Sequence, residues 1–175
     1  MRTVCLHGPE STGKTTLAAQ LAEHFGTVAV PEYGRLYCEI FGNECDLDDL
    51  RAIRQGEKLL IEAGRRKAKN GLMILDTDAV MTAVWADVLL GHRPPDLDRI
   101  DDPADLYLLC DIDVPFVADT VRYFPDPATR ARMFEQCRAE LERRGLPYVL
   151  IGGSREQRLK TAIAAIESHM PEMIG

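Results

Sequence analysis

The sequence predicts an α/β sandwich built on a mainly parallel β-sheet, and three observations support this fold class. Five short apolar runs recur along the 175 residues and alternate with segments whose apolar residues follow a helical period. One of these runs, 72–75, is apolar throughout, as in a strand buried on both faces of a sheet. A glycine-rich turn links the first run to the first helical segment. Strands that alternate with helices typically form parallel sheets covered by helices on both faces.

The element boundaries follow from local signals. Asp46 and Asp126 are favourable N-cap residues, and Ser154 with Gln157 forms a capping box. Gly145 is a helix stop. The expected strands are 3–6, 27–30, 72–75, 106–110 and 147–151. The expected helices are 14–25, 33–41, 47–69, 79–90, 115–123, 127–144 and 155–170, with 91–102 as irregular loop.

Length and composition predict a single globular domain over 1–175. Hydrophobic residues make up 46% and charged residues 28%, which is ordinary for a soluble protein. No apolar run reaches the length of a membrane span. The chain enters its first strand directly after Met1 and Arg2, which leaves no room for a signal peptide. We therefore expect a cytoplasmic protein without membrane partners, either a monomer or a small homo-oligomer.

The charged and metal-ligating residues exclude two classes of function. A net charge of −7 argues against nonspecific binding of nucleic acid, which needs a basic surface. The five cysteines form no C-x-x-C pair and the four histidines are scattered, so no zinc site is expected. Any metal is expected to be Mg²⁺ that arrives with a nucleotide.

The strongest motif is the phosphate-binding loop between the first strand and the first helix. Residues 8–15 read G-P-E-S-T-G-K-T and fit the pattern G-x-x-x-x-G-K-S/T. Its glycines let main-chain N–H groups approach a phosphate, and the helix N-terminus adds partial positive charge. The lysine is placed near the β- and γ-phosphates of ATP, and the threonine hydroxyl can ligate Mg²⁺. The expected nucleotide-binding residues are Gly8, Glu10, Ser11, Thr12, Gly13, Lys14, Thr15 and Thr16. The alternative is a chance glycine-rich turn.

Acidic and basic side chains follow the other strands. Ligands of parallel sheets bind at the carboxyl ends of the strands, so these residues should meet near the loop. Asp76 can hold Mg²⁺ or accept a proton, or it can cap a helix. Asp78 can be a helix cap or a substrate ligand. Glu32 can bind an acceptor hydroxyl and Arg35 an anion or a hydroxyl pair, unless the two form only a surface ion pair.

A lid and an aromatic contact complete the expected site. Arg122, Arg130 and Arg132 lie in a polar segment, approximately 115–132, that can cover a transferring phosphoryl group. The alternative is solvated helix charge, for which Arg132 is the best candidate. Tyr33 is the better candidate for stacking on a ligand ring, because Trp85 lies inside a helix and is expected to pack in the core.

These segments together resemble the nicotinamide riboside kinase domain of the bacterial NAD-salvage regulator family. The resemblance rests on G-P-E-S-T-G-K-T-T-L at 8–17, E-Y-G-R at 32–35 and D-T-D at 76–78. It continues with V-A-D-T-V-R at 117–122 and L-P-Y-V at 146–149, so it covers nearly the whole chain. It implies a P-loop kinase fold with strand order 2-3-1-4-5. It also implies transfer of the ATP γ-phosphate to the 5′-hydroxyl of nicotinamide riboside, giving nicotinamide mononucleotide.

The combined hypothesis is a stand-alone small-molecule kinase that uses ATP and Mg²⁺, since the chain has no room for the adenylyltransferase or DNA-binding domains of some relatives. Lys14 and the loop amides would hold the phosphates, and Thr15 with Asp76 would organise Mg²⁺. Either Glu32 or Asp76 would be the base. The expected acceptor-binding residues are Glu32, Tyr33, Arg35, Asp76 and Asp78, and the cations expected on the γ-phosphate are Arg122 and Arg130.

Three alternatives remain at this point. The first is a kinase of the same fold that acts on another nucleoside, nucleotide or small metabolite. The second is a nucleotide switch or an ATP sensor without catalysis, although the sequence has no N-K-x-D segment of the kind that reads guanine in GTPases. The third is an ATPase that needs no acceptor. These alternatives differ in which acceptor, if any, binds beside the phosphate loop.

Overall fold

A five-stranded parallel sheet forms the centre of the computed structural model, which describes residues 1–115 and 126–171. Its strands are β1 (Arg2–His7), β2 (Val28–Val30), β3 (Leu72–Asp76), β4 (Leu106–Cys110) and β5 (Tyr148–Ile151). The strand order is β2-β3-β1-β4-β5, and every neighbouring pair is parallel. The strand order implied by the resemblance is therefore confirmed.

The described helices fall largely where caps and breakers place them. They are α1 (Lys14–His24), α2 (Tyr33–Phe41), α3 (Leu47–Lys67), α4 (Ala79–Leu90), α5 (Pro95–Asp98), α6 (Pro127–Arg144) and α7 (Arg155–His169). Capping boxes open both α3 and α7. The prediction of an irregular segment over 91–102 is wrong at α5, a short helix with Pro95 at its first position. The expected helix at 115–123 falls mostly outside the described residues, as does Arg122.

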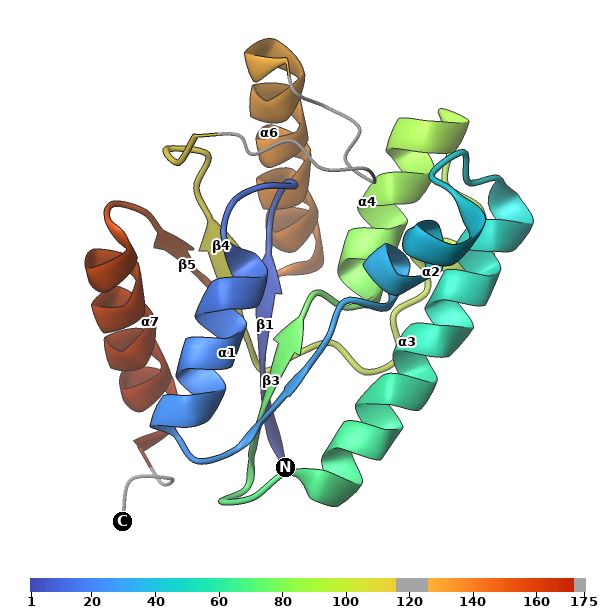
Figure 1. Cartoon of the computed structure of the whole chain (residues 1–175). Coiled ribbons are helices and arrows are strands. Elements are labelled where there is room, and N and C mark those ends of the chain that lie inside the picture. The colour runs from blue at the N-terminus through green and yellow to red at the C-terminus, as the bar shows by residue number, and fades with distance from the viewer. Residues whose placement is uncertain (116–125, 172–175) are drawn as a thin grey trace.

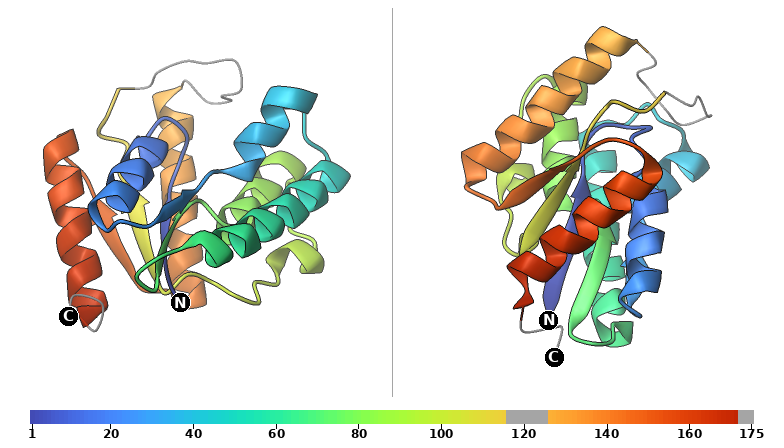
Figure 2. Two further views of the ribbon diagram at one scale, coloured as in Figure 1. Left: turned by 60° about the horizontal axis from the view of Figure 1, so that its bottom comes forward. Right: turned by 90° about the vertical axis from the view of Figure 1, so that its left-hand side faces the viewer.

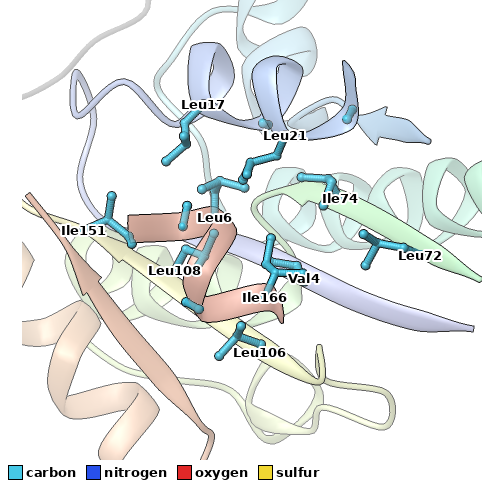
Figure 3. Packing of buried hydrophobic residues seen from close by; sticks show 14 of the residues in the cluster. Val4, Leu6, Leu17, Leu21, Leu72, Ile74, Leu106, Leu108, Ile151 and Ile166 are labelled. Carbon is cyan, nitrogen blue, oxygen red and sulfur yellow. The ribbon is translucent and has the colours of Figure 1, made fainter. Parts of the chain in front are cut away.

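Helices cover both faces of the sheet, which gives three layers. In the right-hand view of Figure 2 the sheet lies between α1 and α7 on one side and α4 and α6 on the other. Figure 3 shows the first face, where alternate strand residues such as Val4 and Leu6 meet Leu17 and Leu21 of α1. Cys5, between them in sequence, points to the opposite core, because successive side chains of a strand alternate. In the described part of the chain, no helix is both long and apolar enough to span a membrane.

The carboxyl ends of β1 and β3 lie side by side and point toward the top of Figure 1, and this arrangement positions the site. Leu6 of β1 is in register with Asp76 of β3, so the loop after β1 starts next to that carboxylate. The chain that leaves β2 enters α2, which packs on α3, and α3 in turn packs on α4. Three helices therefore stand beside the phosphate loop at this edge of the sheet (Figure 1).

Candidate active site

The phosphate loop connects β1 to α1 and depends on its two glycines. Gly8 has a φ of 130° and Gly13 a φ of 81°, both in the region that favours glycine. A Cβ atom on Gly8 would lie 2.8 Å from the carbonyl oxygen of Cys110, at the end of β4. The close approach to β4 therefore excludes any larger residue at this position. This packing fixes the start of the loop against the sheet.

The Lys14 side chain lies within the phosphate loop and hydrogen-bonds to its backbone. Its Nζ donates hydrogen bonds to the carbonyl oxygens of Gly8 at 3.0 Å and Pro9 at 2.7 Å, and only 8% of the residue is exposed. The Thr12 hydroxyl also donates to Pro9, at 2.9 Å. Because Lys14 opens α1, its ammonium group lies beside amides that have no partner within the helix. Positive charge is thus concentrated where a phosphate would lie.

Asp76 and Thr15 bring two oxygen ligands together next to the loop. The Thr15 hydroxyl donates a 2.6 Å hydrogen bond to Oδ2 of Asp76. Oδ1 of Asp76 is buried and has no hydrogen-bond partner among the described residues. Hydroxyl and carboxylate oxygens are ligands that Mg²⁺ prefers, so this pair fits the ion. Within the described ranges, no group of three or more His, Cys, Asp and Glu side chains could hold a metal by itself.

Glu32 lies beside the phosphate loop at the start of α2. It is half-buried, and its pKa is raised to about 7, mainly by burial. The positive charges of Lys14 and Arg35 oppose this increase, while the negative charges of Asp76 and Glu10 contribute to it. A carboxyl group with a pKa near neutrality can accept and release a proton at physiological pH.

Two of the predicted arginines lie near the site, and one lies in solvent. Arg35 lines the cavity and donates a 2.9 Å hydrogen bond to Glu39, one helical turn further along α2. Arg130 of α6 is buried, and its guanidinium lies 3.5 Å from the carbonyl oxygen of Ser11 in the phosphate loop. Arg132 is exposed and donates to the Thr129 hydroxyl at 3.1 Å. The described end of the predicted lid therefore contacts the phosphate loop through Arg130.

One continuous cavity of about 180 Å³ joins the phosphate loop to the space between α3 and α4. All eight residues predicted to bind the nucleotide line it: Gly8, Glu10, Ser11, Thr12, Gly13, Lys14, Thr15 and Thr16. The rest of the lining is Glu32, Gly34, Arg35, Cys38, Cys45, Leu50, Ile53, Glu57, Thr77, Met81, Thr82, Trp85 and Leu89. Trp85 packs in the core as expected, and it also lines the cavity. The cavity is thus polar at the loop and largely apolar between the helices.

Three predicted acceptor-binding residues, Tyr33, Asp76 and Asp78, do not line this cavity. Asp76 is hydrogen-bonded to Thr15 beside the phosphate loop. Oδ1 of Asp78 accepts a 3.0 Å hydrogen bond from the backbone N–H of Val80, and Oδ2 accepts one of 2.6 Å from the Tyr107 hydroxyl. Asp78 therefore acts as the N-cap of α4. The ring of Tyr33 lies so close to Gly56 that a Cβ there would approach it to 2.1 Å. Tyr33 thus packs α2 onto α3, because glycine leaves room for its ring.

Three residues of the site were not predicted. Arg158 of α7 donates to the carbonyl oxygen of Thr12 at 3.0 Å and to that of Asp111 at 3.1 Å, so it braces the phosphate loop against the end of β4. Glu57 and Thr82 face one another inside the cavity. Glu57 interrupts the apolar stripe of α3 four residues after Ile53, and this was the signal available in the sequence.

A family model described as an AAA domain matches residues 3–158. The chain belongs to this AAA-domain family. The matched range runs from β1 to Arg158 and includes the phosphate loop, Glu32 and Asp76. Every part of the site described above, including the three residues that were not predicted, therefore falls within the family match.

This AAA domain is homologous to part of NadR. It is 30% identical over 157 residues to the trifunctional NAD biosynthesis/regulator protein NadR of Escherichia coli (strain K12). The match covers 86% of this chain but only 38% of that relative. A crystal structure of NadR protein in complex with NR superposes with a TM-score of 0.74 at 26% identity, over 96% of this chain and 50% of that chain. The resemblance found in the sequence is therefore confirmed.

A thymidylate kinase from Ehrlichia chaffeensis has the same fold over its whole length. Its TM-score is 0.67 at 16% identity, over 94% of this chain and 98% of that chain. This similarity concerns the fold alone, and it confirms the P-loop kinase architecture. Together with the family match and the superposition on NadR, this fold supports an ATP-dependent phosphotransferase.

Proposed function

We propose that this chain is a kinase that transfers the γ-phosphoryl group of ATP to the 5′-hydroxyl of nicotinamide riboside. The observation that carries the proposal is the position of Glu32, a carboxyl group with a pKa of about 7 that lines the same cavity as Lys14 and the phosphate loop. A nucleotide switch or a simple ATPase has no need of a tunable acid facing an apolar acceptor space. Homology to NadR supports the choice of acceptor.

The phosphates of ATP would bind to the loop amides, to Lys14 and to the N-terminus of α1. In binding, Lys14 would exchange its contacts with the Gly8 and Pro9 carbonyls for phosphate oxygens. Arg130, beside the Ser11 carbonyl, can add positive charge over the γ-phosphate. Arg122 lies outside the described residues, and its role in the lid stays a prediction.

Thr15 and Asp76 would hold Mg²⁺, with phosphate oxygens and water completing its ligands. When bound, Mg²⁺ neutralises charge on the β- and γ-phosphates. The Thr15 hydroxyl, which now donates to Asp76, would then turn its lone pairs to the ion, and the buried Oδ1 of Asp76 would gain a partner. This arrangement leaves Asp76 as a metal ligand and assigns the proton transfer to Glu32.

Glu32 would accept the proton of the 5′-hydroxyl as the hydroxyl oxygen forms its bond to the γ-phosphorus. The bond from that phosphorus to the bridging oxygen breaks at the same time, and ADP leaves with the electron pair. Arg35 lines the adjacent wall and can hold the ribose hydroxyls. Asp78 and Tyr33 are not assigned to the acceptor, because both are engaged in packing and capping.

The proposed function is tested by ADP release from Mg-ATP with a panel of acceptors. The panel contains nicotinamide riboside, cytidine, uridine and deoxynucleosides, and the product is identified by mass. We expect nicotinamide riboside to stimulate release far above the rate without acceptor and to yield nicotinamide mononucleotide. Stimulation by a different nucleoside would overturn the assigned acceptor but retain the kinase. Fast release without any acceptor would favour an ATPase.

A further inference from the structure

Glu57 is a buried carboxyl group that lines the cavity, and it has no part in the phosphate binding proposed above. It lies on α3 and is 7% exposed. Ile53, one helical turn earlier, and Trp85 of α4 line the cavity with it. A carboxylate in such surroundings is costly unless a donor or a cation accompanies it. Glu57 therefore needs a hydrogen-bond donor or a positive charge beside it.

Within the protein, Thr82 is the hydrogen-bond partner of Glu57. The Thr82 hydroxyl lies 2.9 Å from both Oε1 and Oε2. A hydroxyl carries one hydrogen, whereas a carboxylate can accept about four hydrogen bonds, so most of the capacity of Glu57 is unused. Among the described residues no arginine or lysine forms an ion pair with Glu57. Arg54, three residues earlier on α3, donates instead to the backbone carbonyls of Leu97 and Arg99.

The pKa of Glu57 reflects this lack of a counter-charge. The pKa is raised to about 8, mainly by burial, and the hydrogen bond from Thr82 and the charge of Arg54 offset only part of the increase. The negative charges of Asp78 and Glu32 contribute to the increase. Burial raises the pKa of the Cys5 thiol on β1, and the negative charge of Glu57 contributes to that increase. The groups around Glu57 are therefore mostly acidic or neutral.

The elements that carry the lining residues show where Glu57 lies along the cavity. Glu32 lies at the N-cap of α2 beside the phosphate loop, whereas Glu57 lies on α3 and lines the cavity together with residues of α4. An acceptor whose hydroxyl reaches Glu32 would extend its base toward Glu57, Trp85 and Met81, which line the cavity between α3 and α4.

We propose that Glu57 selects the acceptor by its base, which is a flat aromatic ring carrying a positive charge. The ring supplies the counter-charge that the protein does not, and a Glu57 carboxylate is strongly attracted to it in a poorly solvated cavity. Trp85 lines the same cavity, and a cation that stacks on the face of its indole would be attracted to it. The inference rests on the proposed function: nicotinamide riboside has a pyridinium ring, whereas cytidine, uridine and thymidine have neutral bases.

The test compares one ring in two charge states. Nicotinamide riboside is cationic, and its 1,4-dihydro form is neutral with the same ribose and carboxamide. Glu57→Gln removes the charge but keeps the size of the side chain and an oxygen for Thr82. Glu62→Gln, at an exposed position of the same helix, is the matched control. Binding of Mg-ATP and thermal unfolding of each variant report whether its fold is intact.

We expect Glu57→Gln to raise the KM for nicotinamide riboside about 10- to 100-fold, which is the usual range for loss of a charge-assisted contact. The KM for the dihydro form should stay unchanged, and Glu62→Gln should affect neither. An equal rise in KM for both forms, or no rise for either, would overturn the inference while leaving the kinase activity in place. Should Glu57→Gln not fold, equal affinity of the wild-type chain for both rings would overturn it, and a clear preference for the cation would support it.

If the wild-type chain does not phosphorylate nicotinamide riboside, the proposed function fails, and binding still tests the role of Glu57. Calorimetry would then compare the 1-methylnicotinamide cation with neutral nicotinamide, both in the presence of Mg-ADP. Preferential binding of the cation that is lost in Glu57→Gln would support the inference. Absence of that preference in the wild-type chain would overturn it.

Discussion

The Thr15 hydroxyl donates a 2.6 Å hydrogen bond to Oδ2 of Asp76, and so joins the first turn of α1 to the end of β3. The two residues are 61 positions apart in sequence and meet because β1 and β3 are adjacent parallel strands. The same pair provides the oxygen atoms assigned to Mg²⁺. Its function can be separated from its structural contribution by changing one atom.

Asp76→Asn should raise the Mg²⁺ concentration needed for half-maximal activity and lower kcat about 100-fold, because an amide oxygen is a weaker ligand than a carboxylate. The substitution keeps an acceptor for Thr15, so the melting temperature should change little. ADP release over a Mg²⁺ titration checks the first result, and calorimetric scanning checks the second. An unchanged Mg²⁺ dependence would remove Asp76 as a metal ligand.

Lys14→Ala should abolish phosphoryl transfer. The ammonium group is the positive side chain at the centre of the loop, and its loss removes charge stabilisation that the helix N-terminus alone does not replace. We expect a fall in kcat of about 1,000-fold or more, measured by ADP release. The circular dichroism spectrum should be that of the wild-type chain. A fully active Lys14→Ala would mean that residues 8–15 do not form the phosphate site.

Glu32 should set the pH dependence of the reaction. A base acts in its deprotonated form, so kcat/KM should rise with pH until it passes the Glu32 pKa of about 7, and then level off. Glu32→Gln should lower kcat far more than it weakens ATP binding, and should abolish the rise near neutrality. Rates from pH 5.5 to 9 check both results. A rise near neutrality that persists in the variant would assign the titration to another group.

Glu57 should make the fold less stable as pH rises. Its pKa is about 8 in the folded chain and about 4.3 in the unfolded chain, so between these values the folded state binds the additional proton. The free energy of unfolding therefore falls as pH rises through this window and is constant above it. The Glu57→Gln side chain does not ionise, so the variant should keep its free energy of unfolding as pH rises. At pH 9 it should be more stable than the wild-type chain by on the order of a few kcal/mol.

Urea unfolding at pH 5 and pH 9 measures this difference. Glu62→Gln again serves as the control, since Glu62 is exposed on the same helix. A stability difference between Glu57→Gln and the wild-type chain that is the same at both pH values would show that Glu57 does not carry the proton in the folded state.

Arg158 should support the binding of ATP but not of the acceptor. It holds the Thr12 carbonyl from the side of the sheet away from α3, and it also forms an ion pair with Asp113. Arg158→Met keeps much of the buried stem but loses the donors, so the loop should lose part of its rigidity. We expect the KM for ATP to rise about tenfold, with the acceptor KM unchanged. Equal changes in both values would point to general destabilisation instead.

Local signals in the sequence were sufficient for most of the fold. Helix α4 starts after the Asp78 cap and ends before Gly91, and both limits are visible in the sequence. Helix α5 was missed because Pro94 and Pro95 favour a loop, although proline is also suited to the first turn of a helix. The phosphate loop was found because its residues are contiguous and their spacing is characteristic.

The rest of the site depends on contacts between distant segments. Asp78 is one of two acids within a D-T-D segment, and only the position of the Tyr107 hydroxyl shows that it points into the protein. Glu57 meets Thr82 through the packing of α3 on α4, and Arg158 meets Thr12 across 146 residues. No spacing rule relates such pairs, so their roles emerge only when the helices are placed around the sheet.

Trp85 is the single tryptophan of the chain, and it lines the end of the cavity that lies between α3 and α4. A ring that enters there would change the environment of this indole, whereas the phosphate loop lies at the other end of the cavity. The intrinsic ultraviolet emission of the unlabelled protein is therefore a direct optical signal of acceptor occupancy. It allows the two substrates to be followed separately and the order of their arrival to be determined by rapid mixing.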